Sequence, residues 1–416
     1  MNNIPVGYIQ TEVGVIPKDW EVKKLGDFSL IRSGESPSKF KMDKIGIPYY
    51  KVEQLNNGNK YTAETPYQIQ ISDPVKKGSI VFPKRGASIM LNKIRIFSTD
   101  SYLDTNLMAL TLDNSIESEF VFYALSYFGL DKIADTTSIP QINNKHINPF
   151  LLSLPPTKAE QTAIATALSD ADALISSLEK LIAKKRLIKQ GAMQELLNVR
   201  TTDLFDLNDD ADLKKNGSGN KVTSKWEVRK LGEIAEIVGG GTPSTHVSQY
   251  WNGTINWFTP TEIGIHKYTY ESQRKITKEG LSNCSARILP IGTILLTSRA
   301  GIGDLSILMK EGCTNQGFQS LIAKEGHSNE YLYYLMQTLK NVLLQNASGS
   351  TFLEISPNKI KQIEVSIPCH EEQIRIASIL SDIDSEIATL ETKLGKARKI
   401  KLGMMQELLT GKIRLV

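Results

Sequence analysis

The segment EQTAIATALSDADALI, residues Glu160–Ile175, returns as EQIRIASILSDIDSEI at Glu372–Ile387. Both copies continue to the pentapeptide MQELL, which begins at Met193 and again at Met405. Apolar residues in each copy recur in steps of three and four, which places them on one stripe of a helix and is typical of a coiled-coil seam. The seam residues that we expect are Ile164, Leu168, Ile175, Leu178 and Ile182 in the first copy, and Ile376, Leu380, Ile387, Leu390 and Leu394 in the second.

A helix of roughly 40 residues is about 60 Å long, and its apolar stripe has to be buried against a partner. The best matching partner in this chain is the other copy. We expect the two helices to pair antiparallel, because a duplication favours two halves related by a twofold axis. The alternative is that each helix packs only on its own domain.

The repeat extends over the whole chain. WEVKKLGD at Trp20 matches WEVRKLGE at Trp226, and TNLMALTL at Thr105 matches TNQGFQSL at Thr314. These and other landmarks keep one order, at separations between 206 and 214 residues. A duplicated half with insertions in its loops explains this pattern, whereas two repeats of this length do not make a solenoid.

Each half begins with strand-like runs such as GSIVF and GTILLTS between glycine and proline residues, and continues through a helical stretch to the long helix. The expected fold class is therefore α+β. Two globular mixed α/β domains stand in a pseudo-twofold arrangement, separated by two long helices that form an antiparallel coiled coil. The expected segments are a first domain at 1–156, a long helix at 157–198, a polar linker at 199–225, a second domain at 226–367 and a second long helix at 368–412.

The composition of the 416 residues is that of a folded protein, with 40% hydrophobic and 23% charged residues and a net charge of +4. The three cysteines form no CxxC pair, which favours a reducing compartment over a disulfide framework. The first residues lack the basic and apolar regions of a signal peptide, and no apolar run approaches the length of a membrane span. We expect a cytoplasmic protein.

No catalytic or metal-binding signature is found. TGKIR at Thr410 lacks the hydroxyl residue of a phosphate-binding loop, and VGGGTPS at Val238 is better explained as a tight turn. The five histidines have no metal-ligand spacing, so we expect no metal. We interpret the repeated acidic pairs, Asp170 with Asp172 and Asp382 with Asp384, as a solvated helix face. These observations favour a binding protein over an enzyme.

DNA is a natural ligand for two similar domains, because twofold proteins contact two half-sites along its helical repeat. Basic side chains bind phosphates, and polar ones read base edges. The candidate DNA-binding residues are Ser36, Ser38, Lys39, Lys41, Lys84, Arg85, Lys93, Arg95, Thr105 and Asn106 in the first half, and Thr242, Ser244, Thr245, Arg299, Thr314, Asn315 and Gln316 in the second. Arg85 and Arg299 occupy matching positions. The loops around these residues differ strongly between the halves, which predicts a split, asymmetric target.

The chain resembles the specificity subunits of type I restriction–modification systems. The resemblance covers nearly the whole chain and rests on TEVGVIPKDWEVKKLGD, WEVRKLGEI, GGGTPS, IPCHEEQIRIASILSDIDSEI and the final MQELLTGKIRLV. One departure is that the first MQELL is not followed by TGKIRL.

The resemblance implies that each variable domain is a target recognition domain that reads one part of a split double-stranded DNA sequence. It implies that the paired helices fix the spacing and dock two methyltransferase subunits, which motor–nuclease restriction subunits then join. S-adenosylmethionine would bind the methyltransferase partner, so this chain would hold no cofactor and catalyse nothing itself.

Two other functions remain open. A DNA methyltransferase or nuclease with a duplicated body would need catalytic elements that are not found here. A coiled-coil scaffold that joins proteins without reading DNA would associate with DNA only weakly and with little dependence on salt, whereas phosphate contacts give a steep salt dependence.

Overall fold

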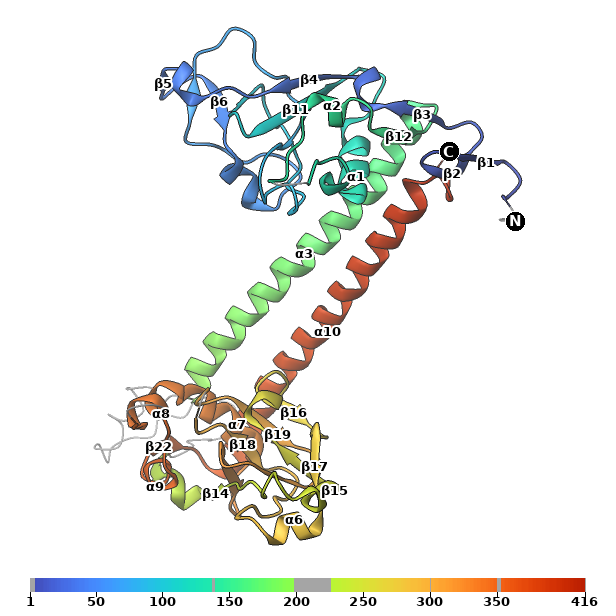
Figure 1. Cartoon of the computed structure of the whole chain (residues 1–416). Helices are drawn as coiled ribbons and strands as arrows, with labels where there is room; N and C mark the ends of the chain where they lie inside the picture. Colours follow the sequence, from blue (N-terminus) through green and yellow to red (C-terminus); the bar gives the residue numbers. More distant parts are fainter. Residues whose placement is uncertain (1–3, 137–138, 198–225, 300, 350–352, 416) are drawn as a thin grey trace, which may run out of the picture. The chain divides into compact units, whose positions relative to one another are not determined.

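The computed structural model describes residues 4–136, 139–197, 226–299, 301–349 and 353–415. The polar linker expected at 199–225 lies outside the described residues. The chain forms two compact units (Figure 1): unit 1 combines Met1–Lys180 with Glu391–Val416, and unit 2 is Leu181–Leu390. The long helices α3 (Lys158–Leu197) and α10 (His370–Leu408) each contribute residues to both units.

Domain 1, the globular part of unit 1, has a central antiparallel sheet in the order β4-β11-β8-β9. Its strands are β4 (Ser29–Ser33), β11 (Leu107–Leu112), β8 (Ile80–Pro83) and β9 (Arg95–Ile96). All four side chains of β8 are buried, as expected for a short apolar run between turn residues. A second sheet in the order β10-β6-β7-β5 contains β10 (Tyr102–Leu103), β6 (Ile47–Tyr50), β7 (Gln68–Ile69) and β5 (Met42–Asp43).

The remaining elements of domain 1 are short. Two-stranded ribbons join β1 (Tyr8–Thr11) to β2 (Gly14–Pro17) and β3 (Glu21–Lys24) to β12 (Leu151–Leu154). The helices are α1 (Ser118–Phe128) and α2 (Asn144–Ile147), with 3-10 turns η1 (Leu25–Asp27), η2 (Pro37–Lys39), η3 (Val52–Asn57) and η4 (Leu130–Lys132).

Domain 2, the globular part of unit 2, repeats this plan. Its central sheet has the order β14-β21-β18-β19-β16, from β14 (Ala235–Gly239), β21 (Gln319–Ala323), β18 (Ile294–Leu296), β19 (Leu305–Leu308) and β16 (Tyr268–Thr269). Its second sheet has the order β17-β15-β20, from β17 (Arg274–Ile276), β15 (Trp251–Phe258) and β20 (Gly312–Thr314). The pairing of β13 (Glu227–Lys230) with β22 (Glu364–Ile367) corresponds to that of β3 with β12.

The helices of domain 2 are α5 (Leu231–Ile234), α6 (Lys278–Ser282), α7 (Asn329–Thr338), α8 (Lys340–Asn346) and α9 (Pro357–Lys361), and its 3-10 turns are η5 (Ser248–Tyr250) and η6 (Pro260–Glu262). The expected fold class, with two mixed α/β domains and two long helices, is confirmed. None of the described helices is long and apolar enough to cross a membrane.

Each domain core is closed by helix ends from both copies of the repeat. In domain 1, Ile164 and Leu168 near the start of α3 are fully buried together with Leu408 and Leu409 from the end of the chain. In domain 2, Ile376 and Leu380 near the start of α10 are buried together with Leu197 at the end of α3. These four seam candidates therefore belong to domain cores. The other six candidates are buried or half-buried along the helices: Ile175, Leu178, Ile182, Ile387, Leu390 and Leu394.

The long helices also pair with each other. In unit 1, Asp172 and Glu179 of α3 bind Lys401 and Arg398 of α10, each at 2.6 Å. In unit 2, Lys185 and Lys189 bind Glu386 at 2.7 Å and Asp384 at 2.6 Å. Residue numbers rise along one helix as they fall along the other, so the pairing is antiparallel, as predicted. The alternative that each helix packs only on its own domain is wrong, although the start of each helix does pack there.

A set of polar contacts, which we call the domain 1 clamp, joins α3 to α1, to the chain around Lys60 and to α10. Asp172 accepts a hydrogen bond from the Tyr123 hydroxyl at 2.8 Å through one oxygen and binds Lys401 at 2.6 Å through the other. Lys60 binds Glu119 at 2.6 Å and the Ser169 hydroxyl at 2.8 Å. Burial, with the hydrogen bond to Asp172, raises the pKa of Tyr123, so its hydroxyl stays a donor at neutral pH.

Domain 2 repeats the clamp with the same residue types. Asp384 accepts from Tyr334 and binds Lys189, both at 2.6 Å. Lys267 binds Glu330 at 2.5 Å and Ser381 at 2.8 Å. The lysine on each aspartate comes from the other copy's helix. The interpretation of the acidic pairs as a solvated face is therefore wrong for Asp172 and Asp384, while Asp170 and Asp382 are exposed.

The end of the chain is anchored on domain 1 by Arg414. Its guanidinium binds the carboxylate of Glu160, whose side chain is 1% exposed, and that of Asp19 at 2.8 and 3.0 Å. In domain 2 the counterpart of Glu160 is Glu372, which binds Arg375 one turn along the same helix. The position equivalent to the TGKIRL segment lies outside the described residues.

We predict that Asp172→Asn lowers the stability of unit 1 by about 1–2 kcal/mol, because Lys401 and Tyr123 lose a charged partner in a partly exposed site. Hydrogen exchange of peptides from α3 should become faster around residues 165–178. Asp170→Asn, two residues away and exposed, is the matched control. Equal exchange in the two variants would show that the clamp does not hold the helix.

Replacing Arg414 by Met should destabilise unit 1 by about 2–3 kcal/mol at pH 7, because Glu160 is left as a buried carboxylate without its cation and Arg414 itself is only partly buried. The hydrogen bond from Arg414 lowers the pKa of Asp19, so this contribution is present above the ordinary carboxyl pKa and is lost as pH falls through the lowered value. Urea unfolding at pH 7 and near pH 3 should therefore show a smaller difference between variant and parent at the acid pH. A difference that does not depend on pH would contradict this account.

Candidate nucleic-acid interface

Three loops meet at one end of the central sheet in domain 1. β4 and β8 both run antiparallel to β11, so their last residues lie beside its first. Gly34 donates its N–H to Leu107 at 3.2 Å, and Lys84 donates its N–H to Asn106 at 2.8 Å. We call residues 34–39, 84–86 and 104–106 the sheet-end loops of domain 1.

Domain 2 builds the same sheet end from residues 240–245, 297–299 and 315–317, its own sheet-end loops. Gly241 donates its N–H to Thr314 at 2.9 Å, and Ser298 donates to Gly317 at 2.8 Å. A Cβ on Gly34 would lie 1.9 Å from the carbonyl oxygen of Asp104, and one on Gly240 would lie 2.0 Å from that of Asn315. Both loop crossings therefore require glycine.

Hydrogen bonds at the two sheet ends show which residues of the two repeats are equivalent, and they differ from the alignment expected from the sequence. Asp104 accepts a hydrogen bond from the N–H of Asn106, and Asn315 accepts the same bond from the N–H of Gly317, both at 2.8 Å. Thr105 is therefore equivalent to Gln316, and not to Thr314 as the shared TN dipeptide suggested.

Seven of the ten candidates in domain 1 lie in its sheet-end loops: Ser36, Ser38, Lys39, Lys84, Arg85, Thr105 and Asn106. Lys41 is exposed ahead of β5 in the second sheet, and Lys93 is half-buried two residues before β9. Within the loops, Ser36 caps η2, and Lys39 binds Glu35 at 3.1 Å.

Arg95 does not lie on the surface as the sequence suggested. It is 9% exposed and donates to the carbonyl oxygens of Leu55 at 2.6 Å and Ile94 at 2.5 Å. Burial lowers the pKa of its guanidinium. Arg95 therefore joins η3 to β9, and its burial does not support the expected contact with DNA.

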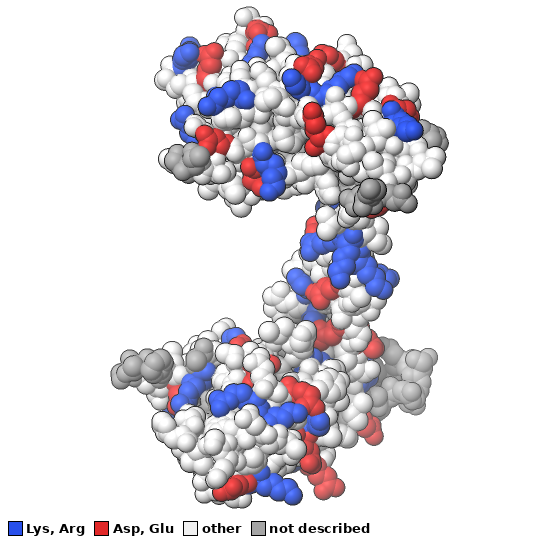
Figure 2. Space-filling view, turned by 45° about the vertical axis from the view of Figure 1, so that its right-hand side comes forward, with Lys and Arg blue, Asp and Glu red and all other residues white. Residues whose placement is uncertain are grey.

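Arg85 gives the domain 1 sheet end its accessible positive charge. It is exposed, and within the described residues no carboxylate lies within ion-pair distance. Burial and the charge of Arg85 lower the pKa of the neighbouring Lys84, while burial raises the pKa of Asp104. Figure 2 shows basic and acidic side chains interspersed on the visible surface, so the local arrangement matters more than the net charge.

The candidates of domain 2 divide differently. Ser244, Thr245 and Gln316 are exposed, Asn315 is half-buried, and Thr242 donates its hydroxyl to the Gln316 side chain. Thr314 is 2% exposed within β20, so its expected contact with DNA is not supported.

Arg299 has the same place in domain 2 as Arg85 has in domain 1, because each makes an isolated bridge, Arg85 with Gln141 and Arg299 with Glu354. The chemistry differs. Arg299 forms an ion pair with Glu354 at 3.1 Å, whereas residue 141 is an uncharged glutamine. The matching arginines therefore share a place in the fold but not a charge environment: of the two, Arg85 alone has no carboxylate partner among the described residues.

Trp251, Trp257 and Arg274 were not among the candidates expected from the sequence. The two indoles pack edge to face, with ring centres 5.0 Å apart. Their N–H groups donate to the carbonyl oxygens of Ser244 and Gly241, at 3.1 and 2.8 Å, and so support the first sheet-end loop. The guanidinium of Arg274 lies 3.7 Å from the ring centre of Trp251. Two tryptophans six residues apart in a variable segment were the available signal.

Domain 1 places other residues at this position. Tyr49 and Tyr67 share a backbone hydrogen bond where Trp257 and Arg274 pair in domain 2, so Tyr67 is the counterpart of Arg274. The ammonium of Lys51 lies 3.7 Å from the ring centre of Tyr67. Both domains thus carry a cation on an aromatic ring beside the sheet end, with different residues in each. Within the described residues no group of three or more His, Cys, Asp or Glu side chains could hold a metal ion.

Comparisons with known proteins agree with the duplicated architecture. The putative type I restriction enzyme MjaX specificity subunit of Methanocaldococcus jannaschii is 28% identical over 429 residues, which cover 98% of this chain and 96% of that protein. The MjaIX specificity subunit of the same organism is 41% identical over 190 residues, 45% of this chain and 44% of that protein.

The crystal structure of a type I restriction–modification S subunit from M. genitalium shares this fold, with a TM-score of 0.57 at 15% identity over 94% of this chain and 96% of that one. The family model described as type I restriction modification DNA specificity domain matches residues 17–187 and 223–398. Each match covers one domain and a large part of its long helix. Because the two matches together cover well over half of the chain, the protein belongs to the family of type I restriction–modification DNA specificity subunits.

Proposed function

We propose that the chain is a non-catalytic subunit in which each domain reads one part of a split, asymmetric double-stranded DNA target. The observation that carries this proposal is that two sheet ends with the same backbone present different side chains. Arg85 with Lys84 and Thr105 lies at one, and Thr242 with Gln316 and Arg274 lies at the other. Two sheet ends with matching backbones but different side chains suit a DNA target whose two parts differ in sequence.

The paired helices would set the spacing between the two parts of the target and dock two methyltransferase subunits, which restriction subunits would join. The proposal places S-adenosylmethionine on the methyltransferase partner and the assembly in the cytoplasm. The antiparallel ion pairs and the crosswise clamp lysines support a spacing role, because they fix the register of α3 against α10.

The first prediction of this proposal concerns methylation. When the chain is co-expressed with its methyltransferase partner, single-molecule sequencing of host DNA should show methylation at one split motif with a fixed gap. The methyltransferase expressed alone is the control and should leave the DNA unmodified. A soluble complex that leaves the DNA unmethylated, or methylation at an uninterrupted motif, would contradict the proposal.

A second prediction separates Arg85 from Arg299. Arg85→Gln should weaken DNA binding by roughly fivefold at moderate salt and reduce the slope of log affinity against log salt by about 1, because one phosphate contact is lost. The control replaces both Arg299 and Glu354 by Gln, which removes the matching arginine without changing net charge, and should leave the slope unchanged. Binding that depends little on salt in the parent protein would favour the coiled-coil scaffold instead.

A further inference from the structure

We propose that Arg274 reads a guanine in the part of the target that domain 2 contacts, with Trp251 as its stacking platform. The inference rests on the proposed function and adds to it the residue and the base. Three other arginines of domain 2 are paired with carboxylates. Arg229 binds Glu227 at 2.8 Å, Arg287 binds Glu236 at 2.8 Å and Arg299 binds Glu354 at 3.1 Å.

Arg274 differs from these three arginines. It is exposed, and no carboxylate of the described residues is within ion-pair distance of it. The nearest acidic residue in sequence, Glu271, is occupied, since it binds Lys275 at 2.6 Å and also Lys310. Hydrogen bonds from these two lysines lower the pKa of Glu271 to about 2, so it stays ionised and paired with them.

The indole under Arg274 is buried and held by contacts of its own. Trp251 is 9% exposed, is packed edge to face on Trp257 and is held by its hydrogen bond to Ser244. A guanidinium over the face of an indole is held by cation–π attraction and stacking, and its N–H groups remain available to a ligand. The side chain therefore loses little further freedom when it binds a ligand through those N–H groups.

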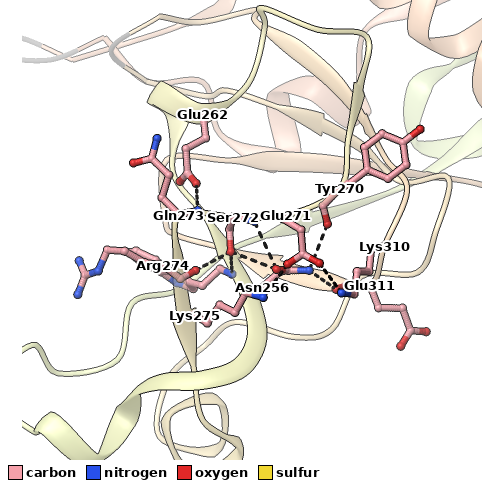
Figure 3. A network of polar contacts seen from close by, with 11 residues as sticks. Asn256, Glu262, Tyr270, Glu271, Ser272, Gln273, Arg274, Lys275, Lys310 and Glu311 are labelled. Carbon is pink, nitrogen blue, oxygen red and sulfur yellow. Dashed lines mark hydrogen bonds and ion pairs between the residues drawn. The ribbon is translucent and has the colours of Figure 1, made fainter.

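The backbone of Arg274 is held by a buried polar network, part of which Figure 3 shows. The buried Ser272 hydroxyl donates to the Arg274 carbonyl oxygen at 2.5 Å and accepts from the N–H of Trp257 at 2.9 Å. Asn256, 1% exposed, donates to the carbonyl oxygens of Tyr270 and Glu311 and accepts from the N–H of Ser272. In the same view the Arg274 side chain extends away from this network.

Guanine is the base that fits this geometry. Its N7 and O6 accept a parallel pair of hydrogen bonds in the major groove, which matches the planar fork of arginine. Thr242 and Gln316 lie on the same sheet end, where Ser244 contacts the platform, and can approach neighbouring base edges. Domain 1 has Tyr67 at the equivalent position, so it lacks this guanidinium, and the effect of Arg274 should be confined to one half of the motif.

The test compares Arg274→Ala and Arg274→Lys with the control Arg229→Ala, each in complex with the methyltransferase partner. Methylation rates are measured on duplexes in which each position of the parent motif is replaced in turn by the other three bases. For Arg274→Ala we expect preference for guanine at one position of one half to fall by about 10- to 100-fold, the discrimination of one bidentate pair. Arg274→Lys should retain part of that preference, and Arg229→Ala should retain all of it.

Two results would overturn the inference while leaving the proposed function intact. One is a uniform loss of rate on all duplexes with a smaller salt slope, which identifies a phosphate contact. The other is an unchanged motif in Arg274→Ala. Melting temperatures equal to that of the parent complex show that the variants are folded. A parent complex without any split motif would instead overturn the proposed function itself.

Discussion

Each domain core is completed by a helix end that comes from the other repeat. Leu408 and Leu409 complete the core that Ile164 and Leu168 begin, and Leu197 does the same for Ile376 and Leu380. Fully burying a leucine or isoleucine contributes about 1.5–3 kcal/mol to the free energy of folding. A domain that lacked the helix end of the other repeat would lose several such contributions, and the core side chains that this helix end covers would be exposed to water. The two clamps exchange polar side chains in the same way. Lys401 of α10 binds Asp172 in unit 1, and Lys189 of α3 binds Asp384 in unit 2.

The side chains at the two sheet ends can vary because the residues that fix the backbone there are separate from those that face outward. Gly34 and Gly240 permit the close crossing of the loops, and Asp104 and Asn315 make the same turn in both domains. The side chains beside them are free to differ, as Arg85 against Gln141 and Arg299 against Glu354 show. The cation–ring contacts beside the sheet ends also differ in their residues. Lys51 lies on Tyr67 in domain 1, and Arg274 lies on Trp251 in domain 2.

Much of the architecture could be predicted from the sequence, because a duplicated chain supplies its own comparison. The seam spacing and the order of the landmarks predicted two mixed domains and an antiparallel helix pair. Predictions for individual residues were wrong where they relied on a short motif and not on the residues around it. Arg95 looked like a loop cation, but isoleucines flank it on both sides and it lies in a strand. The shared TN dipeptide suggested an equivalence that the hydrogen bonds of Asp104 and Asn315 place two residues away.

The clamps could not be predicted, since Tyr123 and Asp172 lie 49 residues apart in the chain and Lys401 a further 229 beyond. The anchoring of Met405, Leu409 and Arg414 in domain 1 also has a consequence for synthesis. The ribosome has to add about 230 residues after Lys180 before the first domain can close, which takes roughly 10–50 s at 5–20 residues per second. During that interval Ile164 and Leu168 lack their contacts with Leu408 and Leu409. The first domain to be made therefore completes its core only after the second domain has been synthesised.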